Sequence, residues 1–247
     1  MSEPTPTGRS VPPLGPEVWE LLRRYDPDFH RAARAHVEVV RRSSHLEPKV
    51  KAFVGLVVDA AVTHLHGPGI RQHLTEALAA GATQDELMEV LECATTVSIH
   101  ALNHGLPILL DVMRERGERT GAAPLDDRRQ RLKDDFTARR GYWNSTWDEL
   151  LEVAPDFFAT YTQLSSVPWD HGHLPPVVKE LLYIAFDASV THLYGVGLRL
   201  HIENALALGA TPEQVVEVMQ IASLIGLRAA GEGVTALAEA TDHREGH

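Results

Sequence analysis

The sequence predicts an all-α fold built from two tandem copies of one helical repeat. The first observation is a duplication: residues 59–73 and 187–201 are identical at 10 of 15 positions, and the same offset of 128 residues pairs Trp19 with Trp147. The second is an apolar periodicity of helical spacing in both halves. The third is a set of clear helix-start signals. No segment has a convincing strand pattern.

Each half is expected to contain the same helices in the same order. A short helix includes the tryptophan, a second helix follows a Pro-Asp-Phe segment, and a long helix follows another proline. A Gly-x-Gly break leads to the next helix, and then come a capped helix and a last helix. The expected landmarks in the two halves are Trp19 and Trp147, Pro27 and Pro155, Pro48 and Pro176, helix ends near Ala80 and Leu208, and last helices after Gly105 and Gly233.

The start of the capped helix is the most legible local signal. Thr83 and Glu86 have the spacing of a capping box, in which the threonine hydroxyl accepts a backbone N–H bond and the glutamate accepts one in return. Residues 211–214 repeat the pattern. Gly81 and Gly209 stand just before, where the preceding helix is expected to end in a left-handed residue.

These signals divide the chain into five segments. Residues 1–15 form a flexible N-terminal lead, 16–116 the first repeat, and 136–241 the second repeat. Residues 117–135 between them are polar and charged, which is typical of a linker or a solvated helix. Residues 242–247 form a polar tail.

Composition narrows the class of protein. The chain has 247 residues, 44% of them hydrophobic, which is enough for a sizeable core. The net charge of -11 argues against a nucleic-acid partner, because phosphate binding needs a basic face. The sequence has no run of 18 apolar residues, so no membrane span is expected. The N-terminus lacks the apolar region of a signal peptide. We therefore expect a cytoplasmic protein with no membrane partner.

The duplicated segment carries the candidate catalytic residues. His64 and His73 flank the Gly-rich break in the first half, and His192 and His201 flank it in the second. Histidine titrates near neutral pH, so it suits proton transfer. The two histidines of each half are therefore expected to face one small pocket.

The break itself is a candidate substrate-binding site. Its second glycine is expected to let the backbone turn, and the N–H groups and dipole of the following helix favour an anion. An arginine in the first turn of that helix can hold a carboxylate at two points. The candidate binding residues are Gly69, Arg71 and His66 in the first half and Gly197, Arg199 and Tyr194 in the second.

A purely structural role is one alternative for the same residues. A Gly-x-Gly segment between helices is often only a tight turn. In that interpretation Arg71 pairs with Asp59 or Glu76, and His64 lies at a helix C-terminus, where a cation is favoured.

A metal site is the other alternative. His64 and His66 offer imidazoles, and His100 and His104 have the spacing that places two imidazoles on one helix face. Their counterparts in the second half are not all histidines, so a metal is not favoured and no cofactor is predicted.

The full pattern of both halves resembles the carboxymuconolactone decarboxylase and alkyl hydroperoxidase-like superfamily. Most of both halves takes part, and the Gly-Ala-Thr segment is its most specific portion. The matching residues are Pro48, Lys51, His64, His73, Ala77, Leu78, Gly81, Ala82, Thr83, Glu86, Glu89 and Val90, and then Pro176, Lys179, His192, His201, Ala205, Leu206, Gly209, Ala210, Thr211, Gln214, Glu217 and Val218.

The resemblance implies a helical fold that assembles into rings, so a tandem chain is expected to form a homo-oligomer, a trimer with six repeats. It also implies what this chain lacks. The peroxidase branch has a Cys-x-x-Cys before the matching histidine, whereas this chain has only Cys93, and thiol peroxidase activity is excluded. The glutamate of that branch matches Glu180 in the second half but Ala52 in the first.

The resemblance therefore leaves the non-redox branch. It implies a cofactor-free acid–base enzyme, a decarboxylase, lyase or isomerase, whose partner is a small carboxylate or lactone. The matching His73 and His201 are then expected to move the proton, with His64 and His192 assisting. Two alternatives remain open at this point. One is a non-catalytic binding or assembly protein on the same scaffold, and the other is a metal-dependent enzyme that uses the histidines of the first repeat.

Overall fold

The computed structural model of the chain describes residues 14–119 and 123–245. These residues form α-helices and two short 3-10 helices, and none of them lies in a strand, so the predicted all-α class is confirmed. The predicted N-terminal lead falls outside the described residues up to position 13. The elements of the first half are α1 (Pro16–Tyr25), α2 (Pro27–Arg42), α3 (Pro48–Ala60), α4 (Gly67–Ala79), α5 (Gln84–Thr95), η1 (Thr96–Ile99) and α6 (His100–Glu115).

The second half repeats this order with one addition. Helices α8 to α13 follow one another as α1 to α6 do, and α7 precedes them. The positions equivalent to α7 belong to the N-terminal segment outside the described residues. The elements are α7 (Asp127–Arg140), α8 (Thr146–Val153), α9 (Pro155–His171), α10 (Pro176–Ala188), α11 (Gly195–Ala207), α12 (Pro212–Ser223), η2 (Leu224–Gly226) and α13 (Leu227–Glu245).

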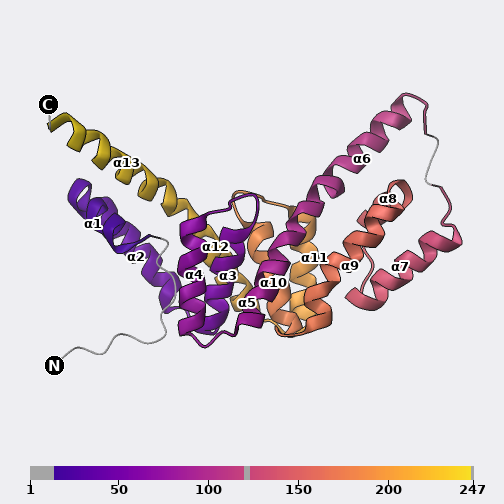
Figure 1. Cartoon of the computed structure of the whole chain (residues 1–247), viewed down its shortest axis with the longest axis horizontal. Coiled ribbons are helices and arrows are strands. Elements are labelled where there is room, and N and C mark those ends of the chain that lie inside the picture. Colours follow the sequence, from indigo (N-terminus) through magenta and orange to yellow (C-terminus); the bar gives the residue numbers. More distant parts are fainter. Residues whose placement is uncertain (1–13, 120–122, 246–247) are drawn as a thin grey trace.

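The last helix of each half packs against the other half. Helix α6 contacts α8 and brings His100 to His192, while α13 contacts α1 and brings Arg228 to Asp59. Figure 1 shows α6 and α13 as two diverging arms on a central body, with α7 to α9 beside α6 and α1 and α2 beside α13. The two repeats are therefore intertwined by exchange of their last helices.

The main core surrounds α3 and α10, which pack against each other. Both helices are buried along nearly their whole length, and this explains why their sequences read as almost continuous apolar runs. Helices α5 and α12 each contact both of them. The long helices thus form the shared centre of the two repeats.

Two buried ion pairs cross this centre. Lys51 Nζ lies 2.6 Å from Glu217 Oε1, and Lys179 Nζ lies 2.8 Å from Glu89 Oε1. Each glutamate also accepts hydrogen bonds from two successive backbone N–H groups of the other half, just before its long helix. Buried charges need such complete pairing. The Lys and Glu positions of the repeat pattern therefore join the two halves.

A smaller aromatic core lies beside the α6 arm. Phe136 from α7 is fully buried, with ring centroids 5.4 Å from Trp147 and 5.7 Å from Phe158. The expected boundary between residues 135 and 136 therefore falls inside α7. In the described part of the predicted linker, the residues before Asp127 lie outside a helix, and the rest belongs to α7. Burial of Phe136 in the aromatic core fixes α7 to the second half.

The break between the long helix and the next one differs from the prediction. Gly67 and Gly69 already belong to the first turn of α4. The left-handed residue is Leu65, with φ 45°, and its counterpart Leu193 has φ 52°. The chain turns over residues 61–66, so the glycines do not make the turn.

The other helix boundaries confirm the capping signals and correct the last helix. Both capping boxes are present, and Gly81 and Gly209 have φ of 85° and 95°. The last helices begin at His100 and Leu227, earlier than expected. Gly105 and Gly233, which were expected to precede them, lie within them. Helix α13 also continues through most of the predicted tail.

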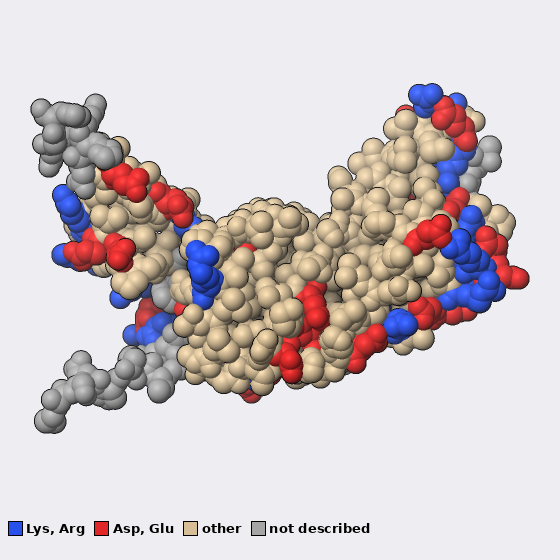
Figure 2. Space-filling model, viewed as in Figure 1, with Lys and Arg blue, Asp and Glu red and all other residues tan. Residues whose placement is uncertain are grey.

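Charged side chains are unevenly distributed on the visible face. Figure 2 shows blue and red atoms gathered near α7 and few charges in the hollow between the two arms. One stretch of the described residues, Pro212–Thr241, is long and apolar enough to span a membrane by length and composition. Part of this stretch is buried in the fold, as in core helices of soluble proteins, so it is weak support for a membrane span.

Candidate functional site

The exchange of last helices creates two equivalent sites. Each combines the long helix and the following loop of one half with the last helix of the other half. Site 1 consists of Asp59, His64, His66, His73 and Arg228, and site 2 consists of Asp187, His192, Tyr194, His201 and His100. At all five positions the residues of the two sites are related by the offset of 128.

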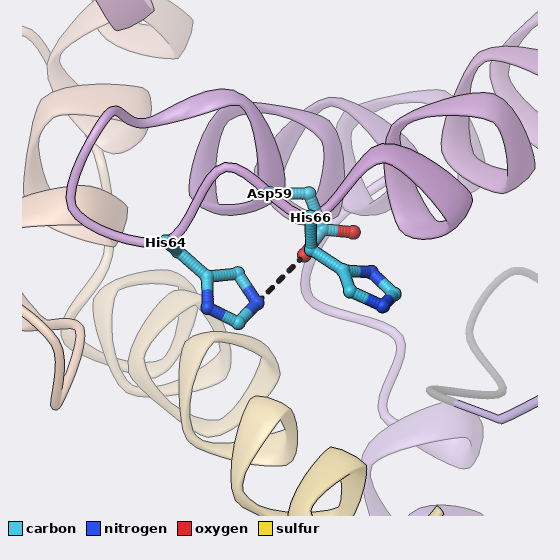
Figure 3. A group of neighbouring side chains, drawn as sticks. All are labelled: Asp59, His64 and His66. Atoms are coloured by element: carbon cyan, nitrogen blue, oxygen red, sulfur yellow. Dashed lines mark ion pairs between the residues drawn. The ribbon is translucent and has the colours of Figure 1, made fainter. Parts of the chain in front are cut away.

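Site 1 is organised around a buried carboxylate. Asp59 is fully buried, and Arg228 Nη2 donates to its Oδ2 at 2.6 Å. His64 Nε2 lies 3.5 Å from Oδ1, as the dashed line in Figure 3 marks. Burial raises the pKa of Asp59, and the positive charge of Arg228 opposes that shift. The guanidinium therefore compensates this buried carboxylate.

His73 in site 1 is enclosed by carboxylates. Its Nε2 lies 3.3 Å from Asp59 Oδ2, and its Nδ1 lies 3.0 Å from Glu76 Oε2. The ring packs onto the backbone of α3 at Gly55, where an added Cβ would lie 2.5 Å from the ring. Both ring nitrogens are engaged, which leaves neither to take a proton from a ligand.

His66 has a structural role in site 1. Its Nδ1 accepts a hydrogen bond of 2.9 Å from the backbone N–H of Gly69, which caps α4. Its Nε2 lies 3.7 Å from Glu232 of α13. His66 and Arg228 also line a cavity of about 120 Å³ between α4, α13 and α1.

Site 2 has a buried carboxylate without a cation. Asp187 is fully buried, and neither of its oxygens has a hydrogen-bond partner among the described residues. His100 stands where site 1 has Arg228, and burial lowers its pKa to about 3, with help from nearby histidines. Burial raises the pKa of Asp187 to about 8. None of the five residues that make up site 2 carries the permanent charge that Arg228 supplies in site 1.

His201 in site 2 has a single carboxylate partner. Its Nδ1 lies 2.6 Å from Glu180 Oε2, and Asn204 donates to the other glutamate oxygen at 3.3 Å. Tyr183, the counterpart of Gly55, packs on the imidazole at 4.7 Å between ring centroids. Glu180 holds Nδ1, so Nε2 is left to exchange a proton. This is the arrangement of an oriented general base.

A cavity of about 40 Å³ adjoins His201. Arg140, the last residue of α7, lines it, and its Nε is buried without a hydrogen-bond partner among the described residues. Burial raises the pKa values of the lining tyrosines Tyr142, Tyr161 and Tyr183, so their phenols stay protonated as donors. The cavity therefore combines one base, one cation and several neutral donors.

The glycines of the duplicated segment provide space for the carboxylates. A Cβ on Gly69 would collide with the Asp59 carboxylate and the Arg228 guanidinium, and a Cβ on Gly197 would collide with the Asp187 carboxylate. The first turns of α4 and α11 are thus occupied by the protein's own acidic groups. This occupancy argues against the predicted anion-binding role of Gly69 and Gly197, although Gly197 and Tyr194 do line the cavity beside His201.

The predicted arginine clamp is also corrected. Arg199 is 83% exposed and pairs with Glu203 at 3.0 Å, and Arg71 is exposed as well. Both arginines are thus exposed, whereas His73 and His201 on the same helices are buried. The cation at the cavity is Arg140, which the sequence interpretation missed.

The four histidines of the metal alternative are not brought together. His64 and His66 lie in site 1, whereas His100 lies in site 2 because α6 crosses to the other half. His104 is exposed. Cys93 is fully buried, and burial raises its pKa to about 12, as fits a core residue rather than a nucleophile.

Comparison with known proteins follows the same division of the chain. The family model described as the carboxymuconolactone decarboxylase family matches residues 27–109 and 155–242. The chain belongs to the carboxymuconolactone decarboxylase family. Each matched region extends into the exchanged last helix of its half, and the family membership confirms the resemblance seen in the sequence.

A solved structure resembles this carboxymuconolactone decarboxylase family protein along most of its length. It is described as a "putative gamma-carboxymuconolactone decarboxylase subunit" from Burkholderia xenovorans LB400. The two chains share 47% identity with a TM-score of 0.89, over 96% of this chain and 94% of that one. No curated protein matches the chain.

The family model leaves out part of the cavity beside His201. Helix α7 with Arg140 lies between the two matched regions, as do Tyr142 and Trp147, which also line the cavity. In this member of the carboxymuconolactone decarboxylase family, the cavity is therefore completed by a segment outside the family pattern.

Proposed function

We propose that site 2 is an active site for acid–base chemistry on a small carboxylated or lactone-type compound, as in decarboxylation with movement of a double bond. The observation that carries this proposal is the His201–Glu180 pair, 2.6 Å apart, at the edge of a cavity that also holds Arg140. Membership of the carboxymuconolactone decarboxylase family supports a decarboxylase-like reaction.

Each side chain at the cavity has a distinct role in this proposal. His201 handles the proton at Nε2, while Glu180 orients the ring and stabilises the imidazolium. In an isomerisation, His201 takes a proton from one carbon of the substrate and returns it to another. In a decarboxylation, the bond to the carboxylate breaks and CO2 leaves, and the imidazolium, which draws its proton from solvent, protonates the carbon that receives the electron pair. Arg140 binds a substrate carboxylate. The neutral phenols of Tyr142 and Tyr161 donate hydrogen bonds to the oxygen on which charge develops.

The cavity must widen when a substrate enters. Its volume of about 40 Å³ holds only a few water molecules, whereas ligand pockets usually have roughly 300 Å³ or more. Val196 lines the cavity and is 53% exposed, so the start of α11 is the part of its wall nearest to solvent. We infer that the ligand enters beside this first turn.

Site 1 is the natural comparison for the test. In the turnover assay, unsaturated acids and lactones are supplied to the wild type and to His201→Ala and His73→Ala. We expect His201→Ala to lower kcat by about 10²- to 10⁴-fold, the usual contribution of general acid–base catalysis. His73→Ala should leave kcat nearly unchanged. Loss of activity only in His73→Ala would place the reaction in site 1.

Binding of the acid is tested separately from turnover. A ligand at 100 times its Kd adds about 2.7 kcal/mol to stability, which a thermal-shift screen detects. Arg140→Ala should abolish the shift given by carboxylic acids, and the exposed Arg199→Ala is the matched control that should keep it. A shift without turnover of any compound would favour a binding protein instead.

A further inference from the structure

We propose that His100, Asp187 and His192 form a binding site for one divalent transition-metal ion, and that Arg228 takes the place of this ion in site 1. The three residues belong to site 2, but none of them has a role in the proposed proton transfer. It rests on the ligand atoms, the unpaired carboxylate and the comparison of the two sites.

The three ligand atoms have the spacing that a metal ion needs. His100 Nδ1 and His192 Nε2 are 2.6 Å apart, and they lie 3.7 Å and 3.8 Å from Asp187 Oδ1. A triangle with these sides has a point about 2.0 Å from all three atoms, and Zn²⁺ lies about 2.0–2.2 Å from imidazole nitrogens and carboxylate oxygens. An ion at this point would take the place of the hydrogen bond that now joins the two imidazoles.

The carboxylate of Asp187 supplies the second argument. A buried carboxylate without a partner is costly, and proteins compensate such groups with a cation, hydrogen bonds or a proton. Asp187 is fully buried and has no hydrogen-bond donor among the described residues. A bound cation would supply the missing compensation.

Site 1 shows what compensation looks like at the equivalent position. The guanidinium of Arg228 meets Asp59 at 2.6 Å, and His100 is the residue that replaces Arg228 in site 2. Site 1 also contains a possible ligand set, Asp59, His64 and His66. However, His66 Nδ1 is used to cap α4, and the charge of Arg228 repels a cation. The ion is therefore expected in site 2.

The donor set indicates which ions bind. Two imidazoles and one carboxylate suit Zn²⁺, Fe²⁺, Co²⁺ or Ni²⁺, whereas Mg²⁺ and Ca²⁺ prefer oxygen ligands only. Three protein ligands leave a coordination position for water. The stacked ring of Tyr194, 3.9 Å from His100 between centroids, holds this ligand in place.

The test is a metal count on the full, untagged chain. Chelator-treated protein is supplied with Zn²⁺, freed of excess ion by gel filtration and analysed for bound zinc. We expect one equivalent per chain in the wild type and in His64→Ala, the matched control in site 1. We expect none in His192→Ala or in His100→Arg, which recreates the aspartate–arginine pair of site 1 and so should keep the fold.

The reverse substitution is the sharper half of the experiment. Arg228→His should bind a second equivalent of zinc, because it gives site 1 the residue that site 2 has. With Co²⁺, visible absorption bands in the wild type that are lost in His100→Arg would identify nitrogen ligation. No zinc in the wild type, or one equivalent retained in both His192→Ala and His100→Arg, would overturn the proposal.

Metal count and turnover separate this inference from the proposed function. Zinc retained in His201→Ala with turnover lost supports both. Zinc absent from a fully active wild type overturns the metal site and leaves the acid–base proposal standing.

Discussion

Sites 1 and 2 have the same backbone but opposite solutions to the same electrostatic problem. Both place a fully buried aspartate at the end of a long helix, against the first turn of the next helix. Site 1 neutralises Asp59 with Arg228, whereas site 2 surrounds Asp187 with His100 and His192. A duplicated scaffold can thus place a permanently charged arginine beside the buried aspartate in one copy and titratable histidines in the other.

The two histidines predicted to be catalytic, His201 and His73, differ in the same way. In site 2 the carboxylate partner of His201 is Glu180 on α10, and in site 1 the partner of His73 is Glu76 on α4. The equivalents of these glutamates are Ala52 and Asn204. The carboxylate partner of the histidine therefore lies on a different helix in each copy. In site 2 this histidine lines a cavity that also holds Arg140.

The largest expected effect tests where the two halves are alike. Glu217→Ala and Glu89→Ala each leave a buried lysine without its partner, which typically costs about 3–5 kcal/mol. Because the two ion pairs have equivalent contacts, urea unfolding followed by circular dichroism should give costs within about 1 kcal/mol of each other. A markedly smaller cost for one variant would contradict the equivalence of the two interfaces.

The next effect tests where the two sites differ. In chelator-treated protein, Asp59→Asn should cost about 3 kcal/mol, because it leaves the buried charge of Arg228 without a carboxylate. Asp187→Asn should change stability by less than about 1 kcal/mol, because no cation depends on Asp187. Equal losses in the two variants, measured by urea unfolding, would mean that Asp187 has a charged partner after all.

A third comparison concerns the two glycines of each first turn. Gly69→Ala and Gly197→Ala should cost about 1–3 kcal/mol through overpacking against the aspartates. Gly195→Ala is the control, since an added Cβ there meets no atom within 4 Å. Thermal unfolding of the variants provides the measurement. A normal melting temperature for Gly197→Ala would show that Asp187 has room to withdraw.

The smallest effect concerns the two capping boxes. Thr83→Ala and Thr211→Ala should each cost about 1 kcal/mol, because each removes the acceptor for a backbone N–H. Serine retains the hydroxyl, so Thr83→Ser and Thr211→Ser should remain near wild-type stability in the same urea experiment. A loss in the serine variants as large as in the alanine variants would show that the threonine methyl group matters more than the cap.

Local signals in the sequence predicted the local structure well. The capping boxes, the left-handed glycines and the order of the helices depend on neighbouring residues, and the structure confirms them. Gly69 and Gly197 were misjudged because their role depends on an aspartate one helix earlier in the chain. A glycine needed for space cannot be distinguished from a glycine needed for a turn by its flanking residues alone.

The exchange of last helices could not be predicted from periodicity, because an amphipathic helix can pack on either half. One signal was nevertheless present. Each repeat has one lysine, Lys51 or Lys179, and one glutamate, Glu89 or Glu217, at equivalent positions. In the structure each lysine pairs with the glutamate of the other repeat. His100 in the first repeat and Arg228 in the second occupy equivalent positions, so the sequence also shows one position at which the two halves differ in charge.

The exchange gives the covalent link between the repeats a consequence of its own. If the two halves were separate polypeptides, each could pair with a copy of itself, and a pair of first halves would place His100 beside Asp59 and His64. A pair of second halves would place Arg228 beside Asp187 and remove the histidine pair altogether. Joining the halves in one chain fixes the partnership, so every molecule receives one site of each kind.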